Sequence, residues 1–353
     1  MHIPDGYLSP STCAATLAVA APFWYLALGK MKALLQTRLV PLIGLVAAFS
    51  FLVMMFNLPL PGGTSGHAVG LAIAPILLGP WAAMLALSLA LFIQAIFFGD
   101  GGITTFGANC LNLAIVGPWV AYGIYRVLAG SAPLESPRRV LAAALAGYGA
   151  INVAALLTGL ELGVQPIWFQ DASGTPLYAP YPLHIAVPAM LAGHLTIAGL
   201  AEALISGGLV AYVQKSHPEL LSAPVTALDG AAQGWRSTRS LWALIGGLLV
   251  ASPLGLLATG IAWGEWSLDD WQDPVTRQLI TQASGNQAPP EGIPQGLEWL
   301  SQLWSAPIPD YAPEFLHNPY LGYLLSAMLG VGLVVLTLLA LSRLAARLGR
   351  AHR

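Results

Sequence analysis

Long apolar segments without a single charged side chain recur along this chain and restrict what it can fold into. Residues 11–29, 40–56 and 71–98 form such segments, and more follow. A helix needs about 20 mostly apolar residues to cross a bilayer. Only 8% of the 353 residues are charged, whereas soluble domains carry about 25%. The sequence therefore predicts an all-α polytopic membrane protein.

The distribution of charge predicts an orientation for the spans. We expect seven spans in residues 1–214 and two more after residue 239. They cover residues 10–29, 40–56, 67–79, 80–98, 107–127, 139–160, 184–213, 240–262 and 320–342. With Met1 outside, every Lys and Arg except Arg277 falls on the inner side. Because cytoplasmic loops collect Lys and Arg, we expect the N-terminus outside and the C-terminus in the cytoplasm. The two short spans between residues 67 and 98 are critical. With one span fewer there, every later part of the chain would lie on the opposite side of the membrane.

Two regions are expected along the chain. Residues 1–214 form the first membrane domain, and the polar residues 215–239 form a cytoplasmic linker. Residues 240–353 form a second domain of two spans around an outer loop at 263–319. That loop is rich in Trp, Pro and acidic residues. It either gathers cations or stabilises the N-terminal segment.

The N-terminus has the composition of a metal chelate. The amine of Met1, the amide nitrogen of His2 and the imidazole of His2 close a five-membered and a six-membered ring around one ion. Nitrogen donors in a plane suit Ni(II). A cleaved signal peptide has positive charge before its apolar stretch, whereas Lys30 and Lys32 follow it here. We therefore expect Met1 to be retained. The alternative is an unstructured chain end.

A glycine-rich loop at residues 59–67 places His67 on the same predicted side as His2. Its imidazole can complete a plane of four nitrogen atoms; the alternative, which the spacing alone favours, is that it caps a helix or bonds a backbone carbonyl. Amide and carboxylate groups near a cationic site orient its ligands. The residues expected in this role are Asp5, Ser65, Gln94, Asp100 and Asn109. Tight turns and interhelical hydrogen bonds explain these residues equally well.

Glu202 lies well inside a predicted span, after His184 and His194. Ionisable groups inside a membrane are costly and face the bundle interior. Glu202 therefore acts in ion exit or coupling, or else is a paired structural carboxylate. The sequence has no G-x-x-x-x-G-K-[ST] phosphate loop and no H-E-x-x-H or G-x-S-x-G motif. The chain is therefore not expected to be an enzyme or to hydrolyse ATP through such a loop.

Several motifs resemble the CbiM/NikM proteins, the substrate-binding membrane components of energy-coupling-factor transporters for cobalt and nickel. They are residues 1–6 (MHIPDG), 61–67 (PGGTSGH), 78–82 (LGPWA), 98–102 (FGDGG), 107–109 (GAN) and 199–205 (GLAEALI). The resemblance implies an S-component-like core in residues 1–214. It also implies that the Met1 amine, the His2 amide and imidazole, and the His67 imidazole bind the metal.

The resemblance implies partners as well: a transmembrane coupling subunit, two cytosolic ATPase subunits and often a small two-span accessory protein. The C-terminal part resembles the PDGLE domain through residues 252–258, 262–266 and 309–312. The name-giving motif departs from the pattern, because residues 294–298 read PQGLE, with Gln295 in place of aspartate.

The expected function is therefore the capture of Co²⁺ or Ni²⁺ as a transported substrate, with no cofactor, in the cell (inner) membrane of a bacterium or archaeon. Two alternatives remain open at this point. One is an ATP-independent channel or secondary transporter, with a pathway through Glu202 and the histidines of its span. The other is a membrane enzyme that uses the metal. The choice between cobalt and nickel also stays open.

Overall fold

The computed structural model describes residues 1–31, 40–221 and 239–351. Seven of its helical segments are long and apolar enough to cross a membrane. They are Pro10–Met31, Pro80–Phe98, Phe106–Ala129, Pro137–Trp168, Leu183–Ser216, Arg239–Leu257 and Pro319–Leu344. The prediction of a helical, multi-pass membrane protein is confirmed. Of the predicted linker, residues 222–238 lie outside the described part.

The α-helices are α1 (Pro10–Met31), α2 (Val40–Met54), α3 (Ile73–Leu78), α4 (Pro80–Ile93), α5 (Phe106–Asn109), α6 (Gly117–Ala129), α7 (Pro137–Gly163), α8 (Gln165–Trp168), α9 (Leu183–Gly193), α10 (Gly199–Ser216), α11 (Arg239–Ala251), α12 (Pro274–Ala283), α13 (Gln295–Ser301) and α14 (Pro319–Ala351). Three π-helical segments, η2 (Gln94–Phe98), η3 (Cys110–Val116) and η4 (His194–Ala198), continue or join them. The 3₁₀ segments are η5 (Pro218–Leu221), η7 (Ser252–Leu257) and η8 (Pro309–Tyr311). Strands β1 (Leu58–Leu60) and β2 (Thr64–Gly66) form an antiparallel hairpin.

The continuous helix predicted at residues 67–79 is wrong. Only α3, of six residues, is helical there, and at 1.5 Å per residue it is about 9 Å long. Residues 67–72 have no helical structure. Gly70 explains part of this, because its φ of +82° is outside the helical range. The predicted span at 184–213 exists, but η4 interrupts it, with a kink at Thr196.

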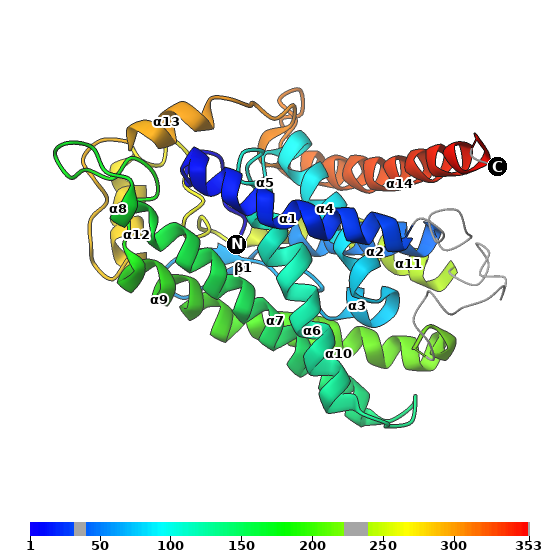
Figure 1. Ribbon diagram of the computed structural model, residues 1–353. Helices are drawn as coiled ribbons and strands as arrows, with labels where there is room; N and C mark the ends of the chain where they lie inside the picture. The colour runs from blue at the N-terminus through cyan, green and yellow to red at the C-terminus, as the bar shows by residue number, and fades with distance from the viewer. Residues whose placement is uncertain (32–39, 222–238, 352–353) are drawn as a thin grey trace.

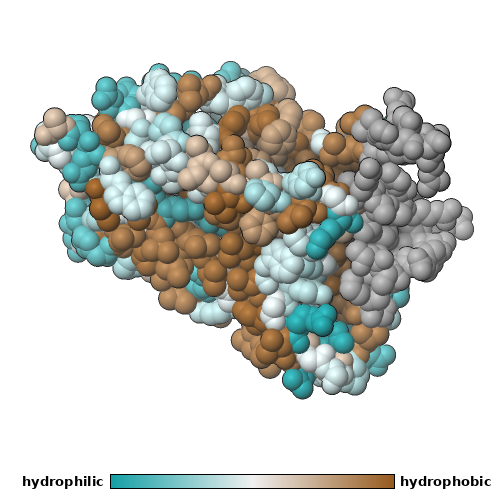
Figure 2. Space-filling model, in the orientation of Figure 1, coloured by the Kyte–Doolittle hydropathy of each residue, from teal (hydrophilic) through white to brown (hydrophobic). Residues whose placement is uncertain are grey.

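The longer helices run along one direction of the molecule, and most connecting segments lie at its ends (Figure 1). Loops and the short helices α8, α12 and α13 lie at one end, on the left in Figure 1, which we call the loop end. The chain before α1 turns back from this end into the middle of the molecule. Hydrophobic surface covers the middle, and hydrophilic residues gather at the loop end (Figure 2). This distribution matches a helical bundle embedded in lipid.

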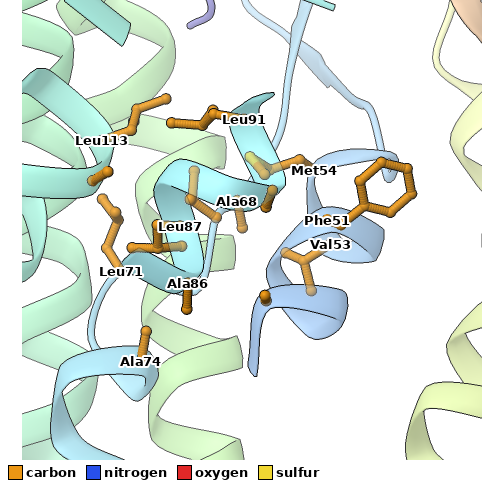
Figure 3. Packing of buried hydrophobic residues seen from close by; sticks show 14 of the residues in the cluster. Phe51, Val53, Met54, Ala68, Leu71, Ala74, Ala86, Leu87, Leu91 and Leu113 are labelled. Carbon is orange, nitrogen blue, oxygen red and sulfur yellow. The ribbon is translucent and has the colours of Figure 1, made fainter. Parts of the chain in front are cut away.

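The core surrounds the segment that follows His67. Side chains of α2, of residues 68–71, of α3 and of α4 gather there, and Figure 3 shows Met54, Leu71 and Leu87 among them. Helix α2 packs against α4 on one side and against α11 and α14 on another. The C-terminal region, which we define as residues 239–351, thus packs directly on the N-terminal region, residues 1–221.

Part of the C-terminal region covers the N-terminal segment. The hydroxyl of Tyr7 donates to the carbonyl of Trp266 at 2.7 Å, and Trp271 Nε1 donates to that hydroxyl at 3.2 Å. Gly6, with a φ of +89°, lies against the backbone of Leu297, where a Cβ atom would come within 2.4 Å of the carbonyl oxygen. Only glycine fits at this position. Residues far apart in the chain therefore close over Met1 and His2.

Candidate metal centre

The N-terminal segment is held in place by side chains of α5 and the loop before it. Asn109 accepts from the Ile3 N–H at 2.8 Å and donates to the Ile3 carbonyl at 3.0 Å. Thr105 donates to the same carbonyl at 2.5 Å, and the Gly102 N–H at 2.9 Å. Met1 is 3% exposed and His2 is 2% exposed. The N-terminus is an ordered, buried segment and not a loose end.

Asp5 fixes the same loop from the other side. Its carboxylate accepts from the N–H groups of Ile103 at 3.0 Å and Thr104 at 2.7 Å, and from the Thr104 hydroxyl. A Cβ atom on Gly102 would lie 2.4 Å from the Asp5 nitrogen. Asp5 and Asn109 therefore position the chain around His2. They make these contacts with backbone and with the hydroxyls of Thr104 and Thr105, not with the imidazoles.

The two predicted histidine ligands lie together. The ring centroids of His2 and His67 are 4.8 Å apart, with 34° between the ring planes. His67 is buried, and its Nδ1–H donates to the Ala68 carbonyl at 3.0 Å. In a neutral ring this bond leaves Nε2 with a free lone pair. The Nε2 atoms of both rings are buried, and no group in the described part of the chain pairs with them. The free Nε2 atom of His67 is suited to bind a metal ion, whereas the predicted chelate uses the other ring nitrogen of His2, Nδ1.

Asp100 contacts the other nitrogen of the His2 ring. Its Oδ1 atom accepts from His2 Nδ1, and its Oδ2 atom accepts from the Tyr311 hydroxyl at 2.6 Å and from Gln94 at 3.3 Å. Burial acts to raise the pKa of Asp100, but the charge and hydrogen bond of His2 outweigh it, and the pKa is lower than usual. Burial, followed by the charge of Asp100, raises the pKa of Tyr311 far above its usual value. Asp100 is therefore an ionised acceptor and Tyr311 a protonated donor.

The amine of Met1 forms an ion pair with a residue of the C-terminal region. Its nitrogen lies 2.5 Å from Oε1 of Glu265. The Met1 side chain is 1% exposed and the Glu265 side chain 19% exposed. A carboxylate partner satisfies a buried ammonium group that has left water. The Met1 amine and His2 Nδ1, two of the nitrogen atoms predicted to chelate the metal, are thus each paired with a carboxylate.

A cavity of about 400 Å³ leads to this site between the two regions. His67, Asp100 and Tyr311 line it together with Glu265 and Asp310. Ser65 also lines it, and the Ser65 N–H donates to the Ile261 carbonyl at 3.4 Å. The predicted residue Asp100 thus bonds His2 and Gln94 bonds Asp100, whereas Ser65 connects the hairpin to the C-terminal region.

Glu202 lies on α10 and is fully buried. Its carboxylate accepts from the N–H groups of Val69, Gly70 and Leu71, between 2.7 and 2.9 Å. It contacts neither His2 nor His67 by a hydrogen bond in the described part of the chain. Instead, it holds the backbone that follows His67.

Sequence reasoning did not single out Glu265 or Tyr311 as individual residues of the site. Glu265 is 264 residues from Met1, and only the fold of the outer loop brings the two together. The acidic composition of that loop was the available signal.

A small cavity of about 10 Å³, lined by Met1 and His194, also borders the site. Within the described residues, no group of three or more His, Cys, Asp or Glu side chains forms a conventional metal cluster. The candidate centre depends on main-chain nitrogen atoms, which such a cluster does not include.

The fold and this geometry define the class: a multi-pass helical membrane protein whose buried N-terminus lies in a nitrogen-rich candidate metal centre. Comparison with known proteins then gives the family. Residues 2–220 match the family described as the cobalt uptake substrate-specific transmembrane region, CbiM. Residues 237–347 match the PDGLE domain. The chain belongs to the CbiM family and carries a C-terminal PDGLE domain, so both predicted resemblances are confirmed.

Relatives of similar length align with nearly the whole chain. A fused nickel transport protein of Rhodobacter capsulatus is 58% identical over 335 residues, which cover 95% of each chain. A probable fused nickel transport protein of Lactiplantibacillus plantarum is 43% identical over 94% of each chain. A crystal structure of a transition metal transporter has 50% identity and a TM-score of 0.57, and the match covers 61% of this chain and 93% of that one.

Proposed function

We propose that this chain captures Ni²⁺ or Co²⁺ as the substrate-specific component of an energy-coupling-factor ABC importer. The ion is the transported substrate and is held by the amine of Met1, the amide and imidazole of His2, and the imidazole of His67. The single observation that carries this proposal is the convergence of His2 and His67 beside the buried N-terminus, with ring centroids 4.8 Å apart. Membership of the CbiM family and the nickel transport relatives support it.

The surroundings of the four nitrogen atoms fit a bound divalent cation. His67 donates its Nδ1–H to a backbone carbonyl, which is the usual arrangement of a metal-binding histidine. For His2 Nδ1 and the Met1 amine to bind the ion, the ion has to replace their contacts with Asp100 and Glu265. Both carboxylates then remain next to a dication, which their charge stabilises. Planar nitrogen ligands favour nickel by geometry.

The rest of the machinery belongs to the same proposal. Two cytosolic ATPase subunits and a transmembrane coupling subunit supply energy, and a small two-span accessory subunit is a further candidate partner. The N-terminus and the loop end face outward and the C-terminus faces the cytoplasm of a bacterial or archaeal cell membrane. Residues 1–214 form the capture domain, residues 215–239 the linker, and residues 240–353 the PDGLE-like domain.

A channel or secondary transporter with a pathway through Glu202 is the alternative class. Two observations weigh against it: Glu202 is fully buried, and its oxygens accept hydrogen bonds from three backbone N–H groups and Ser206. A residue that has to exchange water and ions along a pathway is not expected to be so fully engaged.

Reconstitution distinguishes the two classes. The purified chain is expected to bind one Ni²⁺ in calorimetry, yet liposomes that contain it alone should not accumulate radioactive nickel. Accumulation should require the coupling subunit, the ATPases and ATP. Uptake by the chain alone, without nucleotide, would establish the channel or secondary transporter instead.

A further inference from the structure

Glu202 joins helix α10 to the segment that carries His67. Its Oε2 atom accepts from the N–H groups of Val69 at 2.8 Å and Gly70 at 2.9 Å. Its Oε1 atom accepts from the N–H of Leu71 at 2.7 Å. Three consecutive backbone donors thus converge on one carboxylate, two residues after His67.

The segment depends on this carboxylate because it has no regular structure of its own. Residues 67–72 lie between strand β2 and helix α3, so their N–H groups cannot all find partners within a helix or sheet. A buried N–H group without a partner is costly. The two carboxyl oxygens of Glu202 accept from three of these N–H groups and so provide the missing partners. Glu202 therefore determines where this backbone lies.

The surroundings leave the segment little room to shift by itself. Gly70 has a φ of +82°, and a Cβ atom there would lie 2.9 Å from the ring of Phe49. On the other side, Gly147 of α7 lies close to Glu202, since a Cβ on Gly147 would be 3.2 Å from its Cγ atom. The carboxylate is thus fixed between α7, α10 and the segment.

We propose that Glu202 is a positioning residue for metal binding: it holds the backbone of residues 69–71 so that His67 Nε2 faces His2. This proposal rests on the proposed function, because it takes His67 as a ligand of Ni²⁺ or Co²⁺. It gives the buried carboxylate a role in capturing the ion, in place of a role in ion exit.

Substitution by glutamine separates the hydrogen bonds from the shape of the side chain. Glu202→Gln keeps the size but replaces one acceptor oxygen by an NH₂ group, which cannot accept from a backbone N–H. Ser206→Ala is the matched control, because it removes the hydroxyl that donates to Glu202 at 3.0 Å and leaves the three backbone bonds. Glu202→Asp keeps the carboxyl group on a shorter side chain and serves if the glutamine variant fails to fold.

A double-mutant cycle with His67→Ala tests whether Glu202 acts through His67. Ni²⁺ binding to the purified full chain is measured by calorimetry, and thermal unfolding is recorded for every variant. We expect Glu202→Gln to weaken Ni²⁺ binding about tenfold, the size typical of groups that orient ligands. Ser206→Ala should change Ni²⁺ affinity less than about twofold, below the range for groups that orient ligands. In the His67→Ala background, Glu202→Gln should have almost no further effect, because contacting residues in one network are not additive.

The outcomes separate this proposal from the proposed function. If Glu202→Gln weakens binding equally with and without His67, Glu202 does not act through His67 and the proposal is wrong. If His67→Ala weakens binding and Glu202→Gln or Glu202→Asp only lowers the unfolding temperature, the role is structural, and the capture function stands without it. If His67→Ala itself leaves Ni²⁺ binding unchanged, His67 is not a ligand, and both proposals fail.

Discussion

The two regions of the molecule treat the candidate metal centre differently. The N-terminal region supplies the nitrogen atoms and fixes them largely through backbone hydrogen bonds, as Asn109 does for Ile3 and Glu202 does for residues 69–71. The C-terminal region supplies no predicted ligand and reaches the site through side chains, mainly Glu265 and Tyr311. The N-terminal region therefore provides and positions the predicted metal-binding nitrogen atoms, and the C-terminal region modifies the charge around them. Substitutions in the first should have the larger effects on metal binding.

Blocking the N-terminus should have the largest effect. One residue added before Met1 converts the amine into an amide and places extra atoms where Met1 is only 3% exposed. We expect Ni²⁺ affinity to fall by more than about 100-fold, beyond the range for residues that only orient ligands. Calorimetry on the intact protein, with its mass verified, measures this. A protein with one residue added after Arg353 is the control, and normal binding by the N-terminally extended protein would place the site elsewhere.

Removal of the second imidazole should rank next. His67→Ala deletes one of four nitrogen donors and leaves the chelate of Met1 and His2. We expect affinity for Ni²⁺ to fall about 100-fold, the upper end of the range for the groups around ligands. His184→Ala, which removes an exposed histidine of α9, should leave affinity unchanged. Equal effects of the two variants would contradict a ligand role for His67.

The difference between the regions also explains what the sequence could predict. Apolar segments determine helices by length and composition, so most spans were predictable. The expected meeting of His2 and His67 followed from their placement on one side of the membrane, and the structure brings them together. The helix expected at residues 67–79 was wrong because hydropathy does not register Gly70 at positive φ or a carboxylate that holds three backbone N–H groups. Glu265 and Tyr311 could not be predicted individually, since their contacts depend on how a loop without long helices folds over the N-terminus.

A substitution in the C-terminal region should have a smaller effect through charge. Glu265→Gln keeps an oxygen that can accept from the Met1 amine but removes the negative charge next to it. The uncharged side chain stabilises a nearby dication less, so we expect Ni²⁺ affinity to fall about tenfold, and more at low than at high ionic strength. Glu298→Gln, an exposed residue of α13, changes the net charge equally and serves as the control. If both substitutions lower Ni²⁺ affinity equally, Glu265 contributes only to the overall negative electrostatic potential of the loop.

The smallest effect should come from the Tyr311 hydroxyl. Tyr311→Phe removes the donor to Asp100 but keeps the ring, which stacks on Phe98 with centroids 4.7 Å apart. Gln94 still donates to Asp100 at 3.3 Å, so Asp100 retains a partner and its contact with His2. We expect Ni²⁺ affinity to fall only about threefold, below the usual range for groups that orient ligands. Tyr323→Phe is the matched control, because its hydroxyl donates to the Met55 carbonyl at 2.6 Å and does not bond Asp100. Each variant should lose about 1 kcal/mol of unfolding free energy with its buried hydrogen bond, and only Tyr311→Phe should change metal affinity. A loss from Tyr311→Phe as large as that from His67→Ala would contradict the division between the two regions, because the C-terminal region would then determine the donor geometry too.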